Sequence, residues 1–149
     1  MSKNTFNSSD FGKTNSDISV KLPERLLHKN IEKIAIDSKF SKERNHAVHI
    51  VSLPTNCISM TIGGLLPSEK SNRHRHAYET VAYILEGKGY SIIENRKVVW
   101  QKGDAIYIPN WAWHHHVNSD SKNPAKYLAS ENAPMLQNLG LTGLREESS

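Results

Sequence analysis

The sequence contains one cysteine, Cys57, so no disulfide can form within the chain. Chains with so few cysteines are typical of reducing compartments. Cys57 lies in the strand-like run NCISMTIGG, where we expect a small, buried, apolar residue rather than a nucleophile or a metal ligand.

Long apolar runs and dense positive clusters are also missing. No stretch approaches the roughly 18–20 apolar residues that span a bilayer, and the N-terminus MSKNTFNSSDFGKTNSD lacks the apolar core of a signal peptide. The 19 basic and 15 acidic side chains give a formal charge of +4, but the basic residues are scattered. Nucleic-acid binding usually needs a concentrated basic face. We therefore expect a cytoplasmic protein that binds neither membranes nor nucleic acids.

The length of 149 residues suits one domain with a sizeable core. Residues 1–20 are rich in Ser, Asn, Asp and Lys, which predicts a flexible N-terminal arm. Residues 21–45 are expected to form an N-terminal helix and a link. Apolar residues at Leu22, Leu26, Ile31 and Ile34 predict one short amphipathic helix between positions 22 and 36, followed by a polar link to Asn45.

From His46 to position 132 the pattern is that of short β-strands. The candidate strands AVHIVSL, CISMTIGGLL, TVAYILE, YSIIE, KVVW, AIYIP, WHHHV and KYLASE are separated by Gly, Asn, Asp or Pro. Several short strands separated by such turn residues favour an all-β sandwich or barrel. We expect the tail, residues 133–149, to be an irregular segment that covers one surface of the barrel.

Histidines form the main candidate site. Residues i and i+2 of a strand share a face, so His74 and His76 can both point inward while Arg75 points away. A third metal ligand can come from the run at positions 114–116, in which His114 and His116 share one face and His115 takes the other. His46 and His49 lie on another strand and are not expected to be ligands. The alternative is a set of exposed histidines at strand ends.

The surrounding residues resemble the two motifs of the cupin superfamily. The first motif, an H-x-H pair followed by a later glycine, is matched by His74, His76 and Gly87. The second, G-x5-P-x-G-x2-H-x3-N, is matched at four positions, with Trp111 in place of its second glycine; the matching residues are Gly103, Pro109, His114 and Asn118. The resemblance covers roughly residues 46–132. It implies a double-stranded β-helix, or jelly-roll barrel, with His74, His76 and His114 as metal ligands.

Within the superfamily, the chain resembles the gentisate 1,2-dioxygenase-like cupins. The shared segments are LLPSE, HRH, ILEGKGY and GDAIYIPNWAWHHH. These cupins also lack the usual glutamate ligand, whose place is taken here by Thr80. The resemblance implies that His116 is a pocket residue near the substrate. The family carries an arginine at the position of Ala82 and has two cupin domains. The resemblance therefore does not imply that this chain acts on the family's substrate.

Glu79, next to Thr80, would point outward in a regular strand and could reach the metal only through a bulge. Without a carboxylate ligand, three neutral imidazoles leave the +2 charge of the metal uncompensated, which favours anionic ligands.

We predict His116 and Tyr83 as catalytic residues. The predicted substrate-binding residues are Thr80, Ala82, Trp111, Trp113 and His116.

The functional hypothesis is a non-haem iron(II) dioxygenase that acts with O2 on a small oxygenated compound, aromatic compounds included. One alternative is an isomerase, lyase or hydrolase-like cupin that uses zinc, manganese or nickel. Another is a cupin that binds a metal or small ligand without turnover. The resemblance also implies a homodimer paired through sheet edges.

Overall fold

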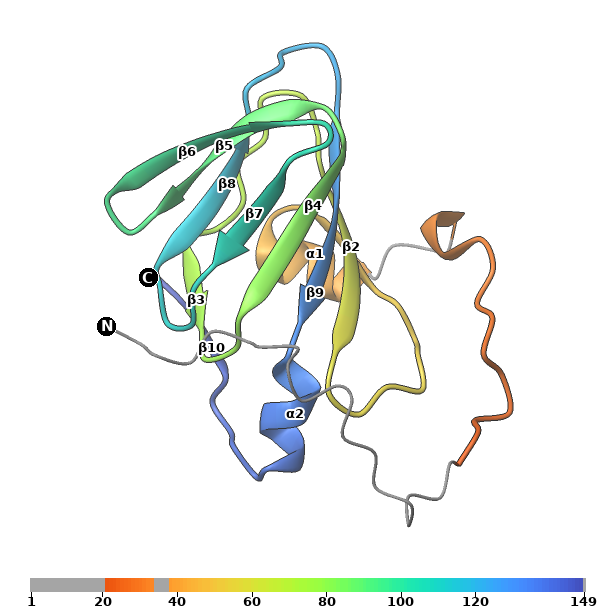
Figure 1. The fold of residues 1–149 in the computed structure, drawn as a ribbon. Helices are drawn as coiled ribbons and strands as arrows, with labels where there is room; N and C mark the ends of the chain where they lie inside the picture. Colours follow the sequence, from red (N-terminus) through yellow and green to blue (C-terminus); the bar gives the residue numbers. More distant parts are fainter. Residues whose placement is uncertain (1–20, 34–37, 149) are drawn as a thin grey trace, which may run out of the picture.

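The computed structural model describes residues 21–33 and 38–148, so the predicted arm at residues 1–20 lies outside the described residues. In the described part of the chain, ten strands form two antiparallel sheets of five strands each (Figure 1). The first sheet has the strand order β1 (Ala47–Ile50), β2 (Ser59–Leu65), β9 (Ala125–Glu131), β4 (Thr80–Glu86), β7 (Ala105–Ile108). The second has the order β10 (Arg145–Glu147), β3 (His74–His76), β8 (His114–Asn118), β5 (Lys88–Ile93), β6 (Arg96–Gln101).

Both sheets contribute to one hydrophobic core, as the alternation of the strands predicts. In β4, Thr80, Ala82 and Ile84 are buried, whereas Val81 and Tyr83 between them are exposed. The core cluster joins Trp100 of the second sheet to apolar residues of the first; its buried members are Leu65, Ile84, Trp100, Ile106, Ile108 and Ala125. The all-β prediction is therefore correct. Across the described residues no strand ladder joins the two sheets, so the fold is a sandwich rather than a closed barrel.

The N-terminal helix does not lie where the leucine spacing predicts it. Residues 21–30 are not helical, and only the short 3-10 turn η2 (Ile31–Lys33) follows them. The α-helix α1 (Ser38–Arg44) falls in the predicted link. Leu22 and Leu26 are more than 70% exposed, so within residues 21–33 and 38–148 these two leucines pack against no surface, and a short helix gains most of its stability from such packing. Asn30 has a φ of 56°, which interrupts a right-handed helix.

Two further predictions need correction. Cys57 is exposed and precedes β2 instead of being buried within it. The C-terminal tail is not irregular: it contains the helix α2 (Ala133–Asn138) and the strand β10, which pairs with β3. Pro134 is tolerated in the first turn of α2, where the missing N–H has no helical partner. Pairing with β10 satisfies the backbone groups along one edge of β3.

None of the helices in the described ranges has the length and apolar character needed to cross a membrane.

Candidate metal centre

Three histidines converge between the sheets. His74 and His76 lie on the inward face of β3, and His114 begins β8 directly opposite His74. The potential ligand atoms of the three rings all lie within 4.8 Å of one another. The side chains of His74, His76 and His114 are 8%, 3% and 1% exposed. The structure thus brings together the three residues that the sequence predicts as metal ligands.

Hydrogen bonds orient each ring in the same way. The Nδ1 atom of His74 lies 2.9 Å from the carbonyl oxygen of Asn72, that of His76 2.7 Å from the carbonyl oxygen of Tyr78, and that of His114 2.8 Å from the carbonyl oxygen of Ala112. Because a carbonyl only accepts, each Nδ1 must carry the proton and donate it. The lone pair of each neutral ring is therefore on Nε2, the atom left for a metal.

Burial keeps these rings uncharged. It is the largest cause that lowers the pKa of His76 and of His114 to about 4, and it moves the pKa of His74 further in the same direction. The neighbouring His114 adds to this effect for His74 and His76. At neutral pH the site therefore offers three neutral nitrogen donors, which need no deprotonation before a metal binds.

The donor set fits a divalent transition metal with open coordination positions. Three imidazole nitrogens are a common ligand set for zinc and also suit iron, copper and nickel. No carboxylate is among the ligands: Glu79 is exposed and its Oε1 accepts a hydrogen bond from Tyr107 Oη at 2.5 Å. Thr80, at the position of the usual cupin glutamate, points inward with its Oγ1 3.4 Å from Glu131 Oε1. A bound metal would therefore keep its full charge and favour anionic partners.

The histidines line a cavity of about 860 Å³. The first sheet supplies its opposite wall through Thr61, Thr80, Ala82, Tyr127 and Glu131, and α2 and the segment up to Arg145 cover it from the C-terminal side. Thr80, Ala82 and His116, which the sequence predicts to be near the substrate, all line this cavity.

His116 differs from the three ligands in its tautomer. Its Nδ1 lies 2.7 Å from Ser91 Oγ, which already accepts the Trp100 indole N–H at 2.9 Å. Ser91 is fully buried, so its own hydroxyl hydrogen is satisfied when it donates to Nδ1 of His116. This arrangement leaves the His116 proton on Nε2. His116 then offers the pocket a hydrogen-bond donor, whereas His74, His76 and His114 offer lone pairs.

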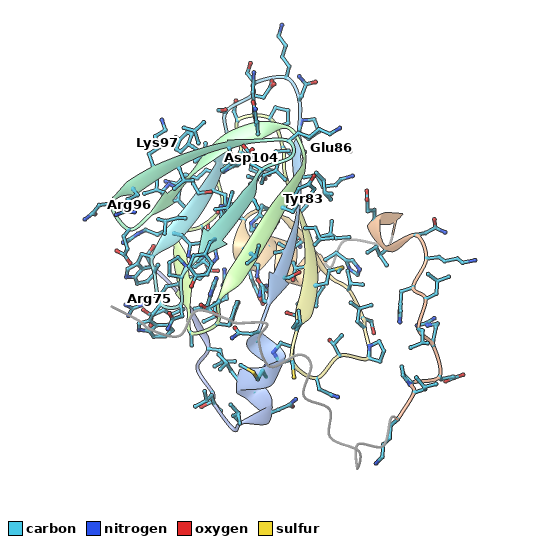
Figure 2. All side chains as sticks on the ribbon, viewed as in Figure 1. Arg75, Tyr83, Glu86, Arg96, Lys97 and Asp104 are labelled. Carbon is cyan, nitrogen blue, oxygen red and sulfur yellow. The ribbon has the colours of Figure 1, made fainter. Side chains whose placement is uncertain are left out.

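The remaining predicted site residues lie outside the cavity. Tyr83 is 47% exposed on the outer face of β4, because it alternates with the inward Ala82 and Ile84 (Figure 2). The Trp111 ring stacks on the guanidinium of Arg75 at 4.7 Å, and the Trp113 ring stacks on Arg73 and Arg75 at 4.6 and 4.7 Å. Tyr83 therefore does not lie beside the histidines, and Trp111 and Trp113 do not line the cavity. Arg75 points away from the histidines, as predicted, and forms an ion pair with Glu146.

Sequence reasoning missed several pocket residues. His46, which we expected to be a non-ligand, lines the pocket as a structural partner: its Nδ1 donates to the Arg44 carbonyl at 2.8 Å and its Nε2 accepts from Tyr127 Oη at 2.8 Å. The Tyr127 ring lies over Gly63, where a side chain would collide with it. The inward alternation of His46 with Val48 is the one signal that could have indicated this role.

Glu131 is the second missed group, at the end of β9. Its carboxyl group lies 3.3 Å from Ser59 Oγ and 3.4 Å from Thr61 Oγ1, in addition to Thr80. Burial is the largest influence on its pKa and raises it, although the three hydroxyl contacts oppose the shift. The pocket therefore contains an acid that holds its proton to a higher pH than a solvated glutamate does.

Comparison with known proteins agrees with this geometry. Residues 62–131 match the model of the cupin domain. The 5-aminosalicylate 1,2-dioxygenase of Comamonas sp is 33% identical over 90 residues, which cover 60% of this chain and 23% of that protein. Gentisate 1,2 dioxygenase 1 of Aquipseudomonas alcaligenes is 33% identical over 73 residues, 48% of this chain and 21% of that protein. The chain thus spans less than a quarter of the length of these curated relatives.

Solved structures share the fold. A salicylate 1,2-dioxygenase of Pseudoaminobacter salicylatoxidans, solved as adducts with gentisate, superposes with a TM-score of 0.64 at 21% identity over 79% of this chain and 33% of that chain. The cupin-2 domain Rru_A2000 of Rhodospirillum rubrum superposes with a TM-score of 0.58 at 18% identity over 71% of this chain and 67% of that chain. At such identities the likeness speaks for the fold alone. Together with the sequence match over residues 62–131, it shows that the chain resembles a cupin domain and, among cupins, the gentisate 1,2-dioxygenase-like ones.

Proposed function

We propose that this cupin is a non-haem iron(II) dioxygenase that acts on a small oxygenated aromatic compound. The observation that carries the proposal is the convergence of three buried, neutral histidines, without a carboxylate, in a cavity large enough for such a compound. The aligned relatives are dioxygenases named for 5-aminosalicylate, gentisate and 1-hydroxy-2-naphthoate. Because this chain spans only part of their length, their activity is a proposal for it.

His74, His76 and His114 would hold the metal through Nε2. When bound, ferrous iron supplies open coordination positions for oxygen donors and a route for electrons between an aromatic substrate and O2. The chain itself would position the substrate. Thr80 and Ala82 are small and leave room beside the ligands, and the Nε2–H of His116 can donate to an oxygen atom of the substrate.

The cavity walls would also handle protons and water. Glu131 can hold a proton within the pocket, since its pKa is raised and its carboxyl group is kept in place by hydroxyl groups. Ala129 and Ile108 present apolar surface to the cavity and limit the water around the reacting groups.

Oxygen uptake provides the test. Metal-free protein is loaded anaerobically with iron(II) and then exposed to O2 with salicylate, gentisate, 5-aminosalicylate or 1-hydroxy-2-naphthoate. We expect uptake with at least one compound, no uptake with zinc in place of iron, and none with His114→Ala. Absence of uptake across a broad panel of hydroxylated aromatics would contradict the proposal, and a native preparation that holds zinc, manganese or nickel without iron would favour a different metal enzyme.

We further propose a homodimer that pairs through exposed sheet edges, a common device for covering unpaired backbone groups. Sedimentation equilibrium of the full chain gives the mass directly, and a monomer at all accessible concentrations would contradict this proposal.

A further inference from the structure

The C-terminal strand β10 continues the alternation of the metal-ligand strand. In their antiparallel pairing Arg145 lies opposite His76, Glu146 opposite Arg75, and Glu147 opposite His74. Residues directly opposite each other in a ladder project from the same face. Arg145 and Glu147 therefore share the inward face of the histidine ligands. The ion pair between Arg75 and Glu146 on the outer face follows from the same register.

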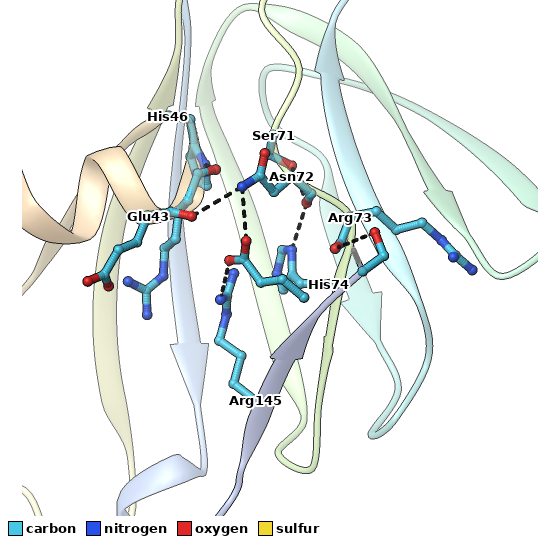
Figure 3. Close-up of polar contacts among 10 residues, drawn as sticks. Glu43, His46, Ser71, Asn72, Arg73, His74 and Arg145 are labelled. Atoms are coloured by element: carbon cyan, nitrogen blue, oxygen red, sulfur yellow. Dashed lines mark hydrogen bonds and ion pairs between the residues drawn. The ribbon is translucent and has the colours of Figure 1, made fainter.

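Arg145 belongs to the wall of the cavity and is held in place there. Its side chain is 19% exposed and its Nη1 pairs with Oε1 of Glu147. The other carboxylate oxygen of Glu147 accepts from Asn72 Nδ2 at 2.9 Å, and the carbonyl oxygen of Asn72 accepts the Nδ1 proton of His74 (Figure 3). A short chain of contacts thus ties the guanidinium group to a metal ligand.

The charge of Arg145 reaches the whole site. After burial, it is among the causes that lower the pKa of each of the three ligand histidines. In the described wall of the cavity the charged side chains are Arg44, Arg145 and Glu131, and burial raises the pKa of Glu131. Two guanidinium groups thus line the cavity with one carboxyl group, and the carboxylate of Glu147 pairs with Arg145 from beside the cavity.

The position of the family's arginine is neutral here. Ala82 lines the same cavity from the opposite sheet but offers no charge or hydrogen bond through its side chain. An arginine presents five N–H groups in a planar fork that matches the two oxygens of a carboxylate. Within residues 21–33 and 38–148 the Arg145 guanidinium contacts one carboxylate, that of Glu147, through Nη1.

We propose that Arg145 binds the carboxylate of an aromatic acid in this cavity, so that the C-terminal strand supplies a guanidinium group beside the three histidines. This inference rests on the proposed function, and it makes the substrate class hydroxylated aromatic carboxylates rather than neutral phenols. It also gives β10 a role in specificity, although this strand lies outside the segment that matches the cupin domain.

Binding of salicylate and of its neutral isostere salicylamide tests the role of Arg145. Both are titrated calorimetrically into anaerobic, iron(II)-loaded full-length protein, so that the metal contributes equally in every variant. We expect Arg145→Gln to lower the ratio of salicylate to salicylamide affinity on the order of 10- to 100-fold. Arg145→Lys should retain part of the ratio, because it keeps the charge and loses the fork.

Glu147→Gln is the matched control, since it breaks the same ion pair from the other side. If Arg145 acts on the ligand, Glu147→Gln keeps the affinity ratio at or above that of the wild type. If Arg145 merely docks β10, both variants lower the affinities for salicylate and salicylamide alike and leave their ratio unchanged, and the proposal is overturned. A ratio unchanged by Arg145→Gln overturns it too.

The outcomes for binding and for reaction are separable. If salicylate affinity depends on Arg145 while no compound supports oxygen uptake, the binding role stands and the proposed dioxygenase function fails. If uptake occurs while the affinity ratio is independent of Arg145, the function stands and the binding role is rejected.

Discussion

The space between the two sheets is filled differently at its two ends. One end is the apolar core around Leu65, Ile84 and Trp100. The other is the cavity, with the three ligand histidines on one sheet and Thr80 and Glu131 facing them from the other. The change occurs within single strands: β4 contributes Thr80 to the cavity and Ile84 to the core.

The difference shows what each end requires of its residues. Apolar side chains at the core end need only fill space, and burying them stabilises the fold by about 25 cal/mol per Å². At the cavity end every buried polar group needs a partner, because a buried polar group without one costs roughly 1–3 kcal/mol. The Nδ1 atoms of His74, His76 and His114 each have a backbone carbonyl as partner. The cavity is thus organised by directional contacts, and the core by volume.

The largest expected effect is at the cavity end. His114→Ala removes one of three nitrogen donors, so metal affinity should fall by more than the roughly 10- to 100-fold typical of a lost outer-shell partner. His115→Ala is the matched control on the same strand, since His115 lies outside the ligand group, and it should keep the affinity within about twofold. Titration of zinc into metal-free protein measures both, and equal losses would mean that the three histidines do not form the site.

The core end should respond to added volume instead. A Cβ atom at Gly89 would overlap the carbonyl oxygen of Val117 and the ring of Trp100, so Gly89→Ala should lower the free energy of unfolding by about 3 kcal/mol.

Gly64→Ala is the control, because its nearest neighbour would be the Ala125 carbonyl oxygen at an ordinary 3.5 Å. This variant should stay within about 0.5 kcal/mol of the wild type. Urea unfolding of metal-free protein compares the two, and similar losses would show that the close approach at Gly89 is relieved elsewhere.

Acid should act through the cavity end in metal-free protein. Burial lowers the pKa of His76 and His114 from 6.5 in an unfolded chain to about 4 in the folded one. Between these values the unfolded state binds protons that the folded state excludes, so the free energy of unfolding falls as the pH drops below 6.5. Each histidine contributes up to about 1.4 kcal/mol per pH unit, and neither contributes above about pH 7.5. Urea midpoints at pH 7.5, 6.0 and 5.0 measure the slope, which His76→Asn should reduce; a flat profile would show that the rings can be protonated in place.

The smallest effect is expected outside both ends. Tyr83 lies on the exposed face of β4, so Tyr83→Phe should leave metal affinity and oxygen uptake unchanged and alter stability by less than about 0.5 kcal/mol. A loss of activity in this variant would restore the catalytic role that the sequence alone suggested.

Local patterns carried much of the prediction. The alternation of H-x-H predicted that His74 and His76 share a face, and the resemblance to the second cupin motif, through Gly103, Pro109 and His114, supplied the third converging histidine. Asn118, at the end of the same motif, holds neighbouring loops together, since its Nδ2 donates to the carbonyl oxygens of Leu65, Leu66 and Asn123. These features could be predicted because strand geometry relates neighbouring positions directly.

The errors have two causes. Leucine spacing at positions 22–36 was consistent with a helix, but a helix of that length depends on a partner surface, and among the described residues Leu22 and Leu26 remain exposed. Tyr83, Trp111 and Trp113 were assigned to the pocket by residue type, whereas their side of the sheet is set by the register of β4 and by the turn at Trp111, where φ is 65°. Residue type alone does not say which face a side chain takes.

The chain's own order of residues determined that strands would form, that their side chains would alternate, and that His74 and His76 would share a face, because each of these follows from positions a few residues apart. The pairing of β3 with β8 is what brings His114 to the same site. Only the tertiary structure decided that Glu131 and His46 line the same cavity, and that a strand at the end of the chain sets Arg145 opposite His76. Pairings between distant segments depend on which edges and faces remain uncovered once the sheets have packed. Local sequence patterns do not determine which edges and faces these are.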